Sequence, residues 1–121
     1  MENKGYKKLK VFAESHKLVV MTYKATEKFP KSELFGLTSQ MRRAAVSVAA
    51  NIIEGQARSS KKEFNRFLFL ANGSLVELEY YLELVLELGY LLPAEYSEID
   101  KQRTAVGMLL GGLIKHFKLD T

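Results

Sequence analysis

A short stretch of the chain gathers cations and hydroxyl groups, namely Arg58, Ser59, Ser60, Lys61, Lys62 and Arg66. Residues 60–63, Ser-Lys-Lys-Glu, match a capping box, in which the serine hydroxyl and the glutamate carboxylate bind backbone N–H groups at a helix start. Cations there face the positive end of the helix dipole, which is unfavourable until an anion binds. Backbone donors, hydroxyls and cations together suit a phosphate. The alternative is a solvated corner whose charges are offset by Glu54 and Glu63.

More cations lie near the N-terminus, at Lys4, Lys7, Lys8 and Lys10. They extend the same surface if the fold brings them to residues 58–66. Terminal lysines that only keep a protein in solution are the alternative.

A polar stripe precedes the basic stretch. Its members recur at steps of three and four residues, which places them on one face of a helix: Gln40, Arg43, Ser47, Asn51, Glu54 and Arg58. Small alanines flank the stripe, so we expect other backbones to approach closely and partner groups to satisfy its polar atoms. A stripe of this kind fixes the register of packed helices or forms contacts between subunits. Arg42 and Arg43 face an acidic stretch, 77–87, if the next helix runs antiparallel. They then form ion pairs within or between protomers, with nucleic-acid contact as the alternative.

Catalytic chemistry has no support in the sequence. The chain contains no Cys and shows no nucleophile elbow, glycine-rich phosphate loop or zinc-protease motif. His16 and His116 lack the spacing of a metal site. We therefore predict no catalytic residues, no metal and no cofactor.

Four helices must position these residues. Apolar periodicity, capping signals and breakers at Pro30, Gly36 and Gly89 predict helices over residues 9–29, 38–55, 60–88 and 93–117, with Thr38 as the second N-cap. Residues 1–121 then form one domain. Short connections favour antiparallel neighbours, so the predicted fold is an all-α, up-down-up-down four-helix bundle.

The third helix carries the most regular apolar pattern. Steps of four and three join Phe64, Leu68, Ala71, Leu75, Leu78, Leu82 and Val85. A flanking line that includes Leu70 and Leu88 widens the apolar surface, so we expect burial on two sides. In the fourth helix Arg103 interrupts the apolar line. Gly107, Gly111 and Gly112 are expected to permit close approach of another helix.

The up-down-up-down topology converts sequence into a charge pattern. The chain carries a net charge of +4. Its topology brings residues 1–17, 54–70 and 109–121 to one end, where eleven Lys and Arg face five Asp and Glu. The remainder holds seven Lys and Arg against nine Asp and Glu. We therefore predict a bundle with one basic end.

Location follows from composition. The absence of Cys fits a reducing cytoplasm. The N-terminal residues lack the apolar run of a secretion signal, and no apolar run is long enough to cross a bilayer. We expect a cytoplasmic protein without a membrane partner.

Several short strings of the sequence form a recognisable set: Phe29-Pro30, Glu33-x-Phe35-Gly36-Leu37, Gln40-x-Arg42-Arg43-Ala44, Ser47, Asn51-Ile52-x-Glu54-Gly55, Arg58 and Gly73-Ser74-x-x-Glu77-Leu78. This set resembles the bacterial "four helix bundle protein" family, whose members are also labelled 23S ribosomal RNA intervening-sequence proteins. The resemblance spans residues 9–117. It implies a four-helix bundle that assembles into a homopentamer, and the related accessory proteins of diversity-generating retroelements bind nucleic acid and a reverse transcriptase.

Two functions follow. We expect a non-enzymatic oligomeric bundle that binds structured RNA, or DNA, through the basic end. The alternative is a structural module that binds a protein partner and no nucleic acid.

Overall fold

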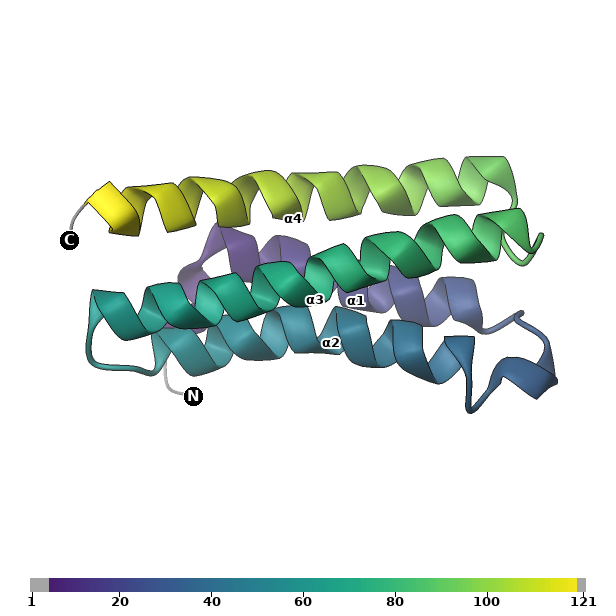
Figure 1. The fold of residues 1–121 in the computed structure, drawn as a ribbon, viewed down its shortest axis with the longest axis horizontal. Helices are drawn as coiled ribbons and strands as arrows, with labels where there is room; N and C mark the ends of the chain where they lie inside the picture. The colour runs from purple at the N-terminus through teal and green to yellow at the C-terminus, as the bar shows by residue number, and fades with distance from the viewer. Residues whose placement is uncertain (1–4, 120–121) are drawn as a thin grey trace.

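Four antiparallel α-helices make up the computed structural model, which describes residues 5–119 (Figure 1). They are α1 (Lys10–Thr26), α2 (Leu37–Gln56), α3 (Lys61–Glu87) and α4 (Pro93–Leu119), with 3-10 turns η1 (Gly5–Lys8) and η2 (Lys31–Glu33). Within residues 5–119 there is no strand. Helices that follow one another in the chain are in contact, and α4 also packs against α1. The diagonal pairs, α1 with α3 and α2 with α4, make no contact. The predicted all-α, up-down-up-down bundle is therefore confirmed.

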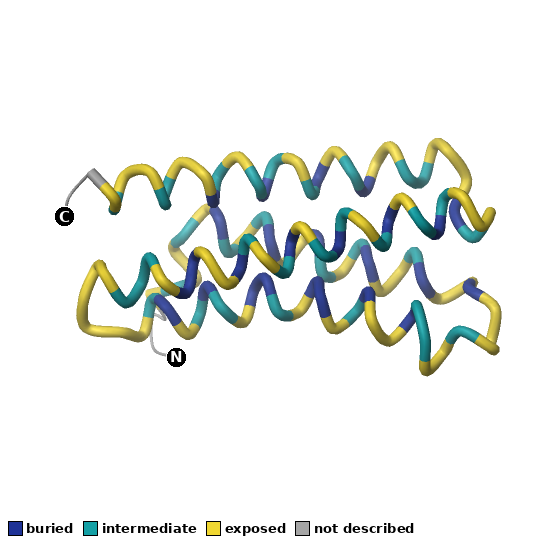
Figure 2. Tube along the Cα trace, in the orientation of Figure 1, coloured by how far each residue is buried: buried dark blue, intermediate teal, exposed yellow. Residues whose placement is uncertain are grey.

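The predicted apolar line of α3 forms the centre of the core. Its members from Leu68 to Val85 are buried, and Phe64 is half-buried. Figure 2 shows the buried positions of every helix facing inward. The flanking line is buried only in part: Phe67 is 8% exposed and Tyr81 is half-buried, whereas Leu70 and Leu88 remain 47% and 50% exposed. No other helix of this chain covers them.

The buried line of α1 includes hydroxyl groups that periodicity alone does not predict. Thr22 donates to the carbonyl of Leu18 at 2.8 Å, and Thr26 donates to the carbonyl of Thr22 at 2.9 Å. Both side chains are buried. A threonine can occupy the core in this way because its hydroxyl bonds a carbonyl of the preceding turn.

Two boundaries differ from the prediction. α1 ends at Thr26 rather than residue 29, because the N–H of Phe29 turns back to the carbonyl of Thr26 (3.1 Å). α2 begins at Leu37, so Thr38 as its N-cap was wrong; Thr38 is buried inside the helix. The carboxylate of Glu33 accepts from the N–H of Leu37 at 3.2 Å and caps the helix instead.

Ser60 and Gly89 mark the two ends of α3 as predicted, while the Glu63 carboxylate pairs with Arg66 at 3.5 Å instead of completing the predicted capping box. Ser60 is the N-cap, and its hydroxyl accepts from the N–H of Glu63 at 3.1 Å. After the last turn, Gly89 adopts φ +79°. The N–H groups of Gly89 and Tyr90 bond the carbonyls of Leu86 and Val85 (3.1 and 2.9 Å), which is a Schellman motif.

α4 contains a polar interruption and three glycines. The Arg103 side chain is 15% exposed and pairs with Asp100 at 2.7 Å and Glu79 at 3.6 Å. A Cβ on Gly107 would touch Leu75 at 3.4 Å, as expected for a close helix contact. Gly111 and Gly112 have no neighbour within 4 Å of such an atom among residues 5–119, so the described part of the chain does not make the close approach predicted there.

Candidate nucleic-acid interface

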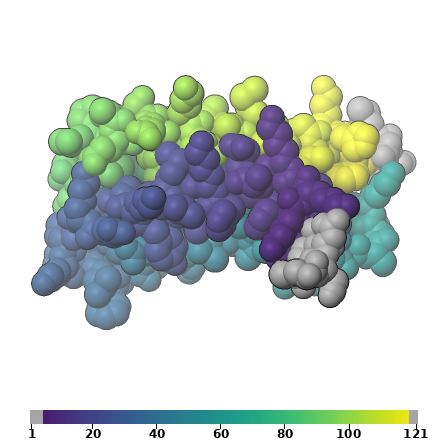
Figure 3. Space-filling view, turned by 180° about the vertical axis from the view of Figure 1, so that it is seen from behind, coloured from purple at the N-terminus to yellow at the C-terminus, as the bar shows by residue number. Residues whose placement is uncertain are grey.

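Three segments far apart in sequence meet at one end of the bundle, as the antiparallel topology requires (Figure 1). The Phe64 ring at the start of α3 lies 5.2 Å from the Phe117 ring near the end of α4. η1 lies against α2, where Gly5 abuts the Gln56 side chain. Viewed from behind, the N-terminal, α2–α3 and C-terminal segments gather on one side (Figure 3).

We call this region the basic end: residues 5–17, 54–70 and 109–119. It carries ten Lys and Arg against three Glu. Lys4, expected to extend the region, lies outside the described residues. The charge pattern thus survives when only described residues are counted.

A glycine sets the geometry of the corner between α2 and α3. A Cβ at Gly55 would lie 2.7 Å from the Phe67 Cβ, 2.8 Å from the Phe64 Cδ1 and 3.2 Å from the Phe64 carbonyl oxygen. Only glycine allows the two helices to approach this closely. The close approach leaves residues 57–60 as a tight connection and brings Arg58 over the first turns of α3.

Arg58 and Arg66 are held on the same aromatic ring. Their guanidinium carbons lie 4.8 and 4.6 Å from the centroid of the Phe67 ring, which is 8% exposed. Arg58 also pairs with Glu54 at 2.9 Å, and Arg66 with Glu63 at 3.5 Å. Both arginine side chains stay about half exposed, at 45% and 57%. They are therefore positioned from within the protein and still offer N–H donors to solvent.

The predicted lysines surround this pair unevenly. Lys61 and Lys62 occupy the first turn of α3 and are exposed. Lys7 and Lys8 end η1, which is held against α1 by the Tyr6 and Phe12 rings, 4.9 Å apart. Lys10 faces the α1–α4 side, where it lines a shallow depression with Met108. The seven candidate cations thus share one end and not one face.

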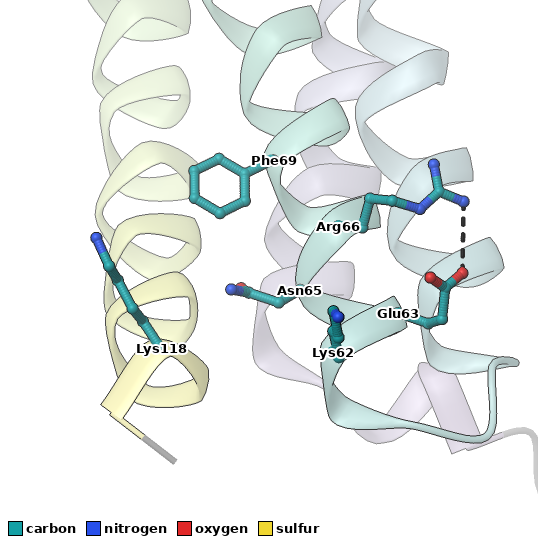
Figure 4. A pocket seen from close by; sticks show the side chains of 6 residues that line it. All are labelled: Lys62, Glu63, Asn65, Arg66, Phe69 and Lys118. Atoms are coloured by element: carbon teal, nitrogen blue, oxygen red, sulfur yellow. Dashed lines mark hydrogen bonds and ion pairs between the residues drawn. The ribbon is translucent and has the colours of Figure 1, made fainter. Parts of the chain in front are cut away.

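The structure contains a groove near Arg66 that the sequence did not predict (Figure 4). It has a volume of about 600 Å³ and lies between the first turns of α3 and the end of α4. Its lining residues are Lys62, Glu63, Asn65, Arg66, Phe69 and Lys118. Steps of three and four from Lys62 to Phe69 signal a common helix face, but nothing in the sequence marks that face as concave.

The polar stripe of α2 is satisfied mainly within the chain. Asn51 donates to the carbonyl and hydroxyl of Ser47 at 2.8 and 3.2 Å, and Ser74 of α3 donates to the Ser47 hydroxyl at 2.9 Å. Gln40 accepts from Arg43 at 3.0 Å. The stripe therefore links α2 to α3.

Arg42 and Arg43 diverge. Arg43 pairs with Glu77 of the acidic stretch at 2.7 Å, and the Tyr81 hydroxyl donates to the same carboxylate at 2.7 Å, which raises the pKa of Tyr81. Arg42 makes no such ion pair among the described residues. It donates to the Thr26 hydroxyl at 2.8 Å and lies 4.7 Å from the Tyr23 ring centroid, on α1.

The two histidines point to aromatic neighbours. His16 stacks on Phe12 at 6.0 Å, and His116 meets the Phe117 ring edge at 5.3 Å. Among residues 5–119, no three His, Cys, Asp or Glu side chains are grouped as a metal site would require. None of the described helices is long and apolar enough to cross a membrane.

Comparison with known proteins places this geometry in a family. The family model described as 23S rRNA-intervening sequence protein matches residues 7–112. The chain belongs to this family. The resemblance noted from its motifs is thereby confirmed, and the matched range contains all seven candidate cations but not Lys118.

A solved structure has the same fold as this chain. It is the crystal structure of a protein with unknown function from the S23 ribosomal protein family of Bacteroides thetaiotaomicron VPI-5482. The two chains are 29% identical, with a TM-score of 0.78, and the match covers 87% of this chain and 98% of the other. The comparison with curated proteins gave no match.

Proposed function

We propose that this protein is a non-enzymatic oligomeric bundle that binds structured RNA through its basic end. The observation that carries the proposal is the convergence of ten Lys and Arg, from three distant segments, on a surface with three Glu. A polyanion that meets such a surface releases its counterions, which supplies affinity without sequence recognition.

The arginines suit phosphate contacts in particular. Because Phe67 and the two glutamates already hold Arg58 and Arg66, little side-chain freedom remains to be lost on binding. The exposed start of α3 adds backbone N–H groups beside Lys61 and Lys62. Contacts of this kind fix a nucleic acid in place with little reading of its bases.

RNA is the first nucleic acid to test, because the family is named for intervening sequences of 23S rRNA. Duplex DNA has the same phosphate chemistry and is the second. A cytoplasmic location stays a prediction from the cysteine-free composition.

We further propose a homo-oligomer, with the pentamer as the expected state. Exposed apolar side chains support it: Phe35 is 93% exposed, Tyr80 61% and Val76 56%. Light scattering should give a mass five times the 13.7 kDa of one chain. A monomer at micromolar concentration would contradict this.

The second candidate is a scaffold that binds protein and no nucleic acid. The exposed Phe35 favours it, because a side chain that large and that exposed suits a protein contact. In this case the charges of the basic end contribute only to the assembly of subunits or protein partners.

Titration separates the two. A structured RNA hairpin and a DNA duplex are titrated with the wild type and with Lys61→Glu/Lys62→Glu at several salt concentrations. Phosphate binding predicts that log affinity falls linearly with log salt, with a slope near 0.9 per contact on a duplex, so the double reversal lowers the slope by about 2. Absence of binding at low salt, or an unchanged double variant, favours the scaffold.

A further inference from the structure

We propose that the groove between α3 and α4 receives one unpaired nucleobase of a bound RNA. This inference rests on the proposed function and adds to it a place where a base, rather than the backbone, is held. The groove, at about 600 Å³, falls in the range of small-ligand sites, and it opens within the basic end (Figure 4).

The wall of the groove offers an aromatic surface. Phe69 is 55% exposed, and among the described residues no other ring lies against it. It differs in this from Phe67, two residues earlier, whose ring is buried beneath two guanidinium groups. An exposed aromatic ring beside cations is the platform on which proteins stack unpaired bases.

An unsatisfied amide lies next to that ring. The Oδ1 of Asn65 is buried and has no hydrogen-bond partner in the described structure. A buried acceptor without a donor is unfavourable, and because this oxygen is buried a ligand in the groove can reach it only after the amide turns. The amide points toward α4 in Figure 4, and rotation about its terminal bond can present either its acceptor or its donors to a base edge.

The charges fit a nucleotide. Lys62, Arg66 and Lys118 are among the described residues that line the groove. The one carboxylate among those lining residues, Glu63, is paired with Arg66, and Figure 4 shows this pair on the side of α3 that faces away from α4. Cations alone would also suit an acidic peptide. The stacking ring and the amide together favour a base attached to a phosphate backbone. A duplex keeps its bases stacked inside, so the base must come from a bulge, a loop or a single strand.

The test compares two RNA hairpins that differ by one bulged nucleotide in an otherwise paired stem. Affinity is measured by fluorescence anisotropy for the wild type, Phe69→Ala, Phe69→Tyr and Leu70→Ala. Leu70 is the matched control, because it follows Phe69 on α3, is 47% exposed and lies outside the groove. We expect the wild type to prefer the bulged RNA by at least about fivefold, the scale of one stacked base.

Phe69→Ala should abolish this preference and leave binding of the paired hairpin unchanged. Phe69→Tyr and Leu70→Ala should keep it, and Asn65→Ala should reduce it. Equal binding of both hairpins by the wild type, with sensitivity to Lys61→Glu/Lys62→Glu, overturns the base site while the phosphate surface stands. Binding of neither hairpin overturns both. A change in oligomer mass caused by Phe69→Ala alone would assign the groove to a subunit contact and also overturn the inference.

Discussion

The absence of a Cβ at Gly55 matters both for the packing of α2 against α3 and for the proposed interface. Replacing it with alanine adds a Cβ in the last turn of α2, which by itself favours folding by at most about 1 kcal/mol. In this structure that atom meets the Cβ of Phe67 at 2.7 Å and the carbonyl oxygen of Phe64 at 3.2 Å. Neither is the free end of a flexible side chain, so α2 and α3 must separate.

Forced insertion of a carbon atom into a packed contact costs about 1 to 3 kcal/mol, so after subtraction of the propensity gain we expect Gly55→Ala to lower the free energy of unfolding by up to about 2 kcal/mol. Gly73→Ala is the matched control. Gly73 lies inside α3, is exposed, and has nothing within 4 Å of an added Cβ. It should raise the free energy of unfolding by about 1 kcal/mol, the helix-propensity difference alone.

Urea unfolding followed by circular dichroism, at one protein concentration for all three proteins, gives both values. The test is whether the two substitutions change the free energy of unfolding in opposite directions. If both substitutions stabilise the protein equally, the helices do not approach at Gly55 as described, and the arrangement of Arg58 over Phe67 loses its support.

Two further predictions concern helix starts. Ser60→Ala should lower the free energy of unfolding by about 1 kcal/mol through loss of the N-cap, whereas Ser59→Ala, which removes no cap, should leave it nearly unchanged in the same urea experiment. The Lys28 ammonium and a backbone N–H hold the pKa of Glu95 below its usual range, so their stabilisation is present above pH 4.5 and is lost as pH falls through the folded pKa. Between pH 5 and 2.5, the free energy of unfolding should therefore fall less steeply with decreasing pH for Glu95→Gln than for the wild type. The same slope in both proteins, or an equal effect of Glu98→Gln, would contradict that assignment.

Much of the fold could be predicted because each helix carries a local signal. The α3 line from Leu68 to Val85 repeats at steps that only one helix face satisfies, and Ser60 and Gly89 mark its ends. The N-cap of α2 could not be predicted in this way. Thr38 has the usual residue type, but the carboxylate of Glu33, four residues before Leu37 and outside the usual N-cap position, takes the role.

The candidate site likewise has one part that the sequence predicts and one part that it does not. The basic end follows from topology and charge, since antiparallel helices must bring alternate connections together. The groove does not, because exposure of Phe69 and burial of the Asn65 oxygen depend on how far α4 stands from α3. Arg42 and Arg43 are adjacent in sequence, yet one contacts α1 and the other α3, since successive helix positions point about 100° apart.

The central claim is that cations gathered at one end bind RNA, and position rather than total charge is its test. Lys61→Glu/Lys62→Glu at the basic end is compared with Lys24→Glu/Lys31→Glu at the other end, where both lysines are also exposed. The two variants have the same net charge. At low salt we predict that the first weakens binding of a structured RNA hairpin by at least about tenfold and the second by less than about threefold. Equal losses, or no binding by the wild type, would contradict the account.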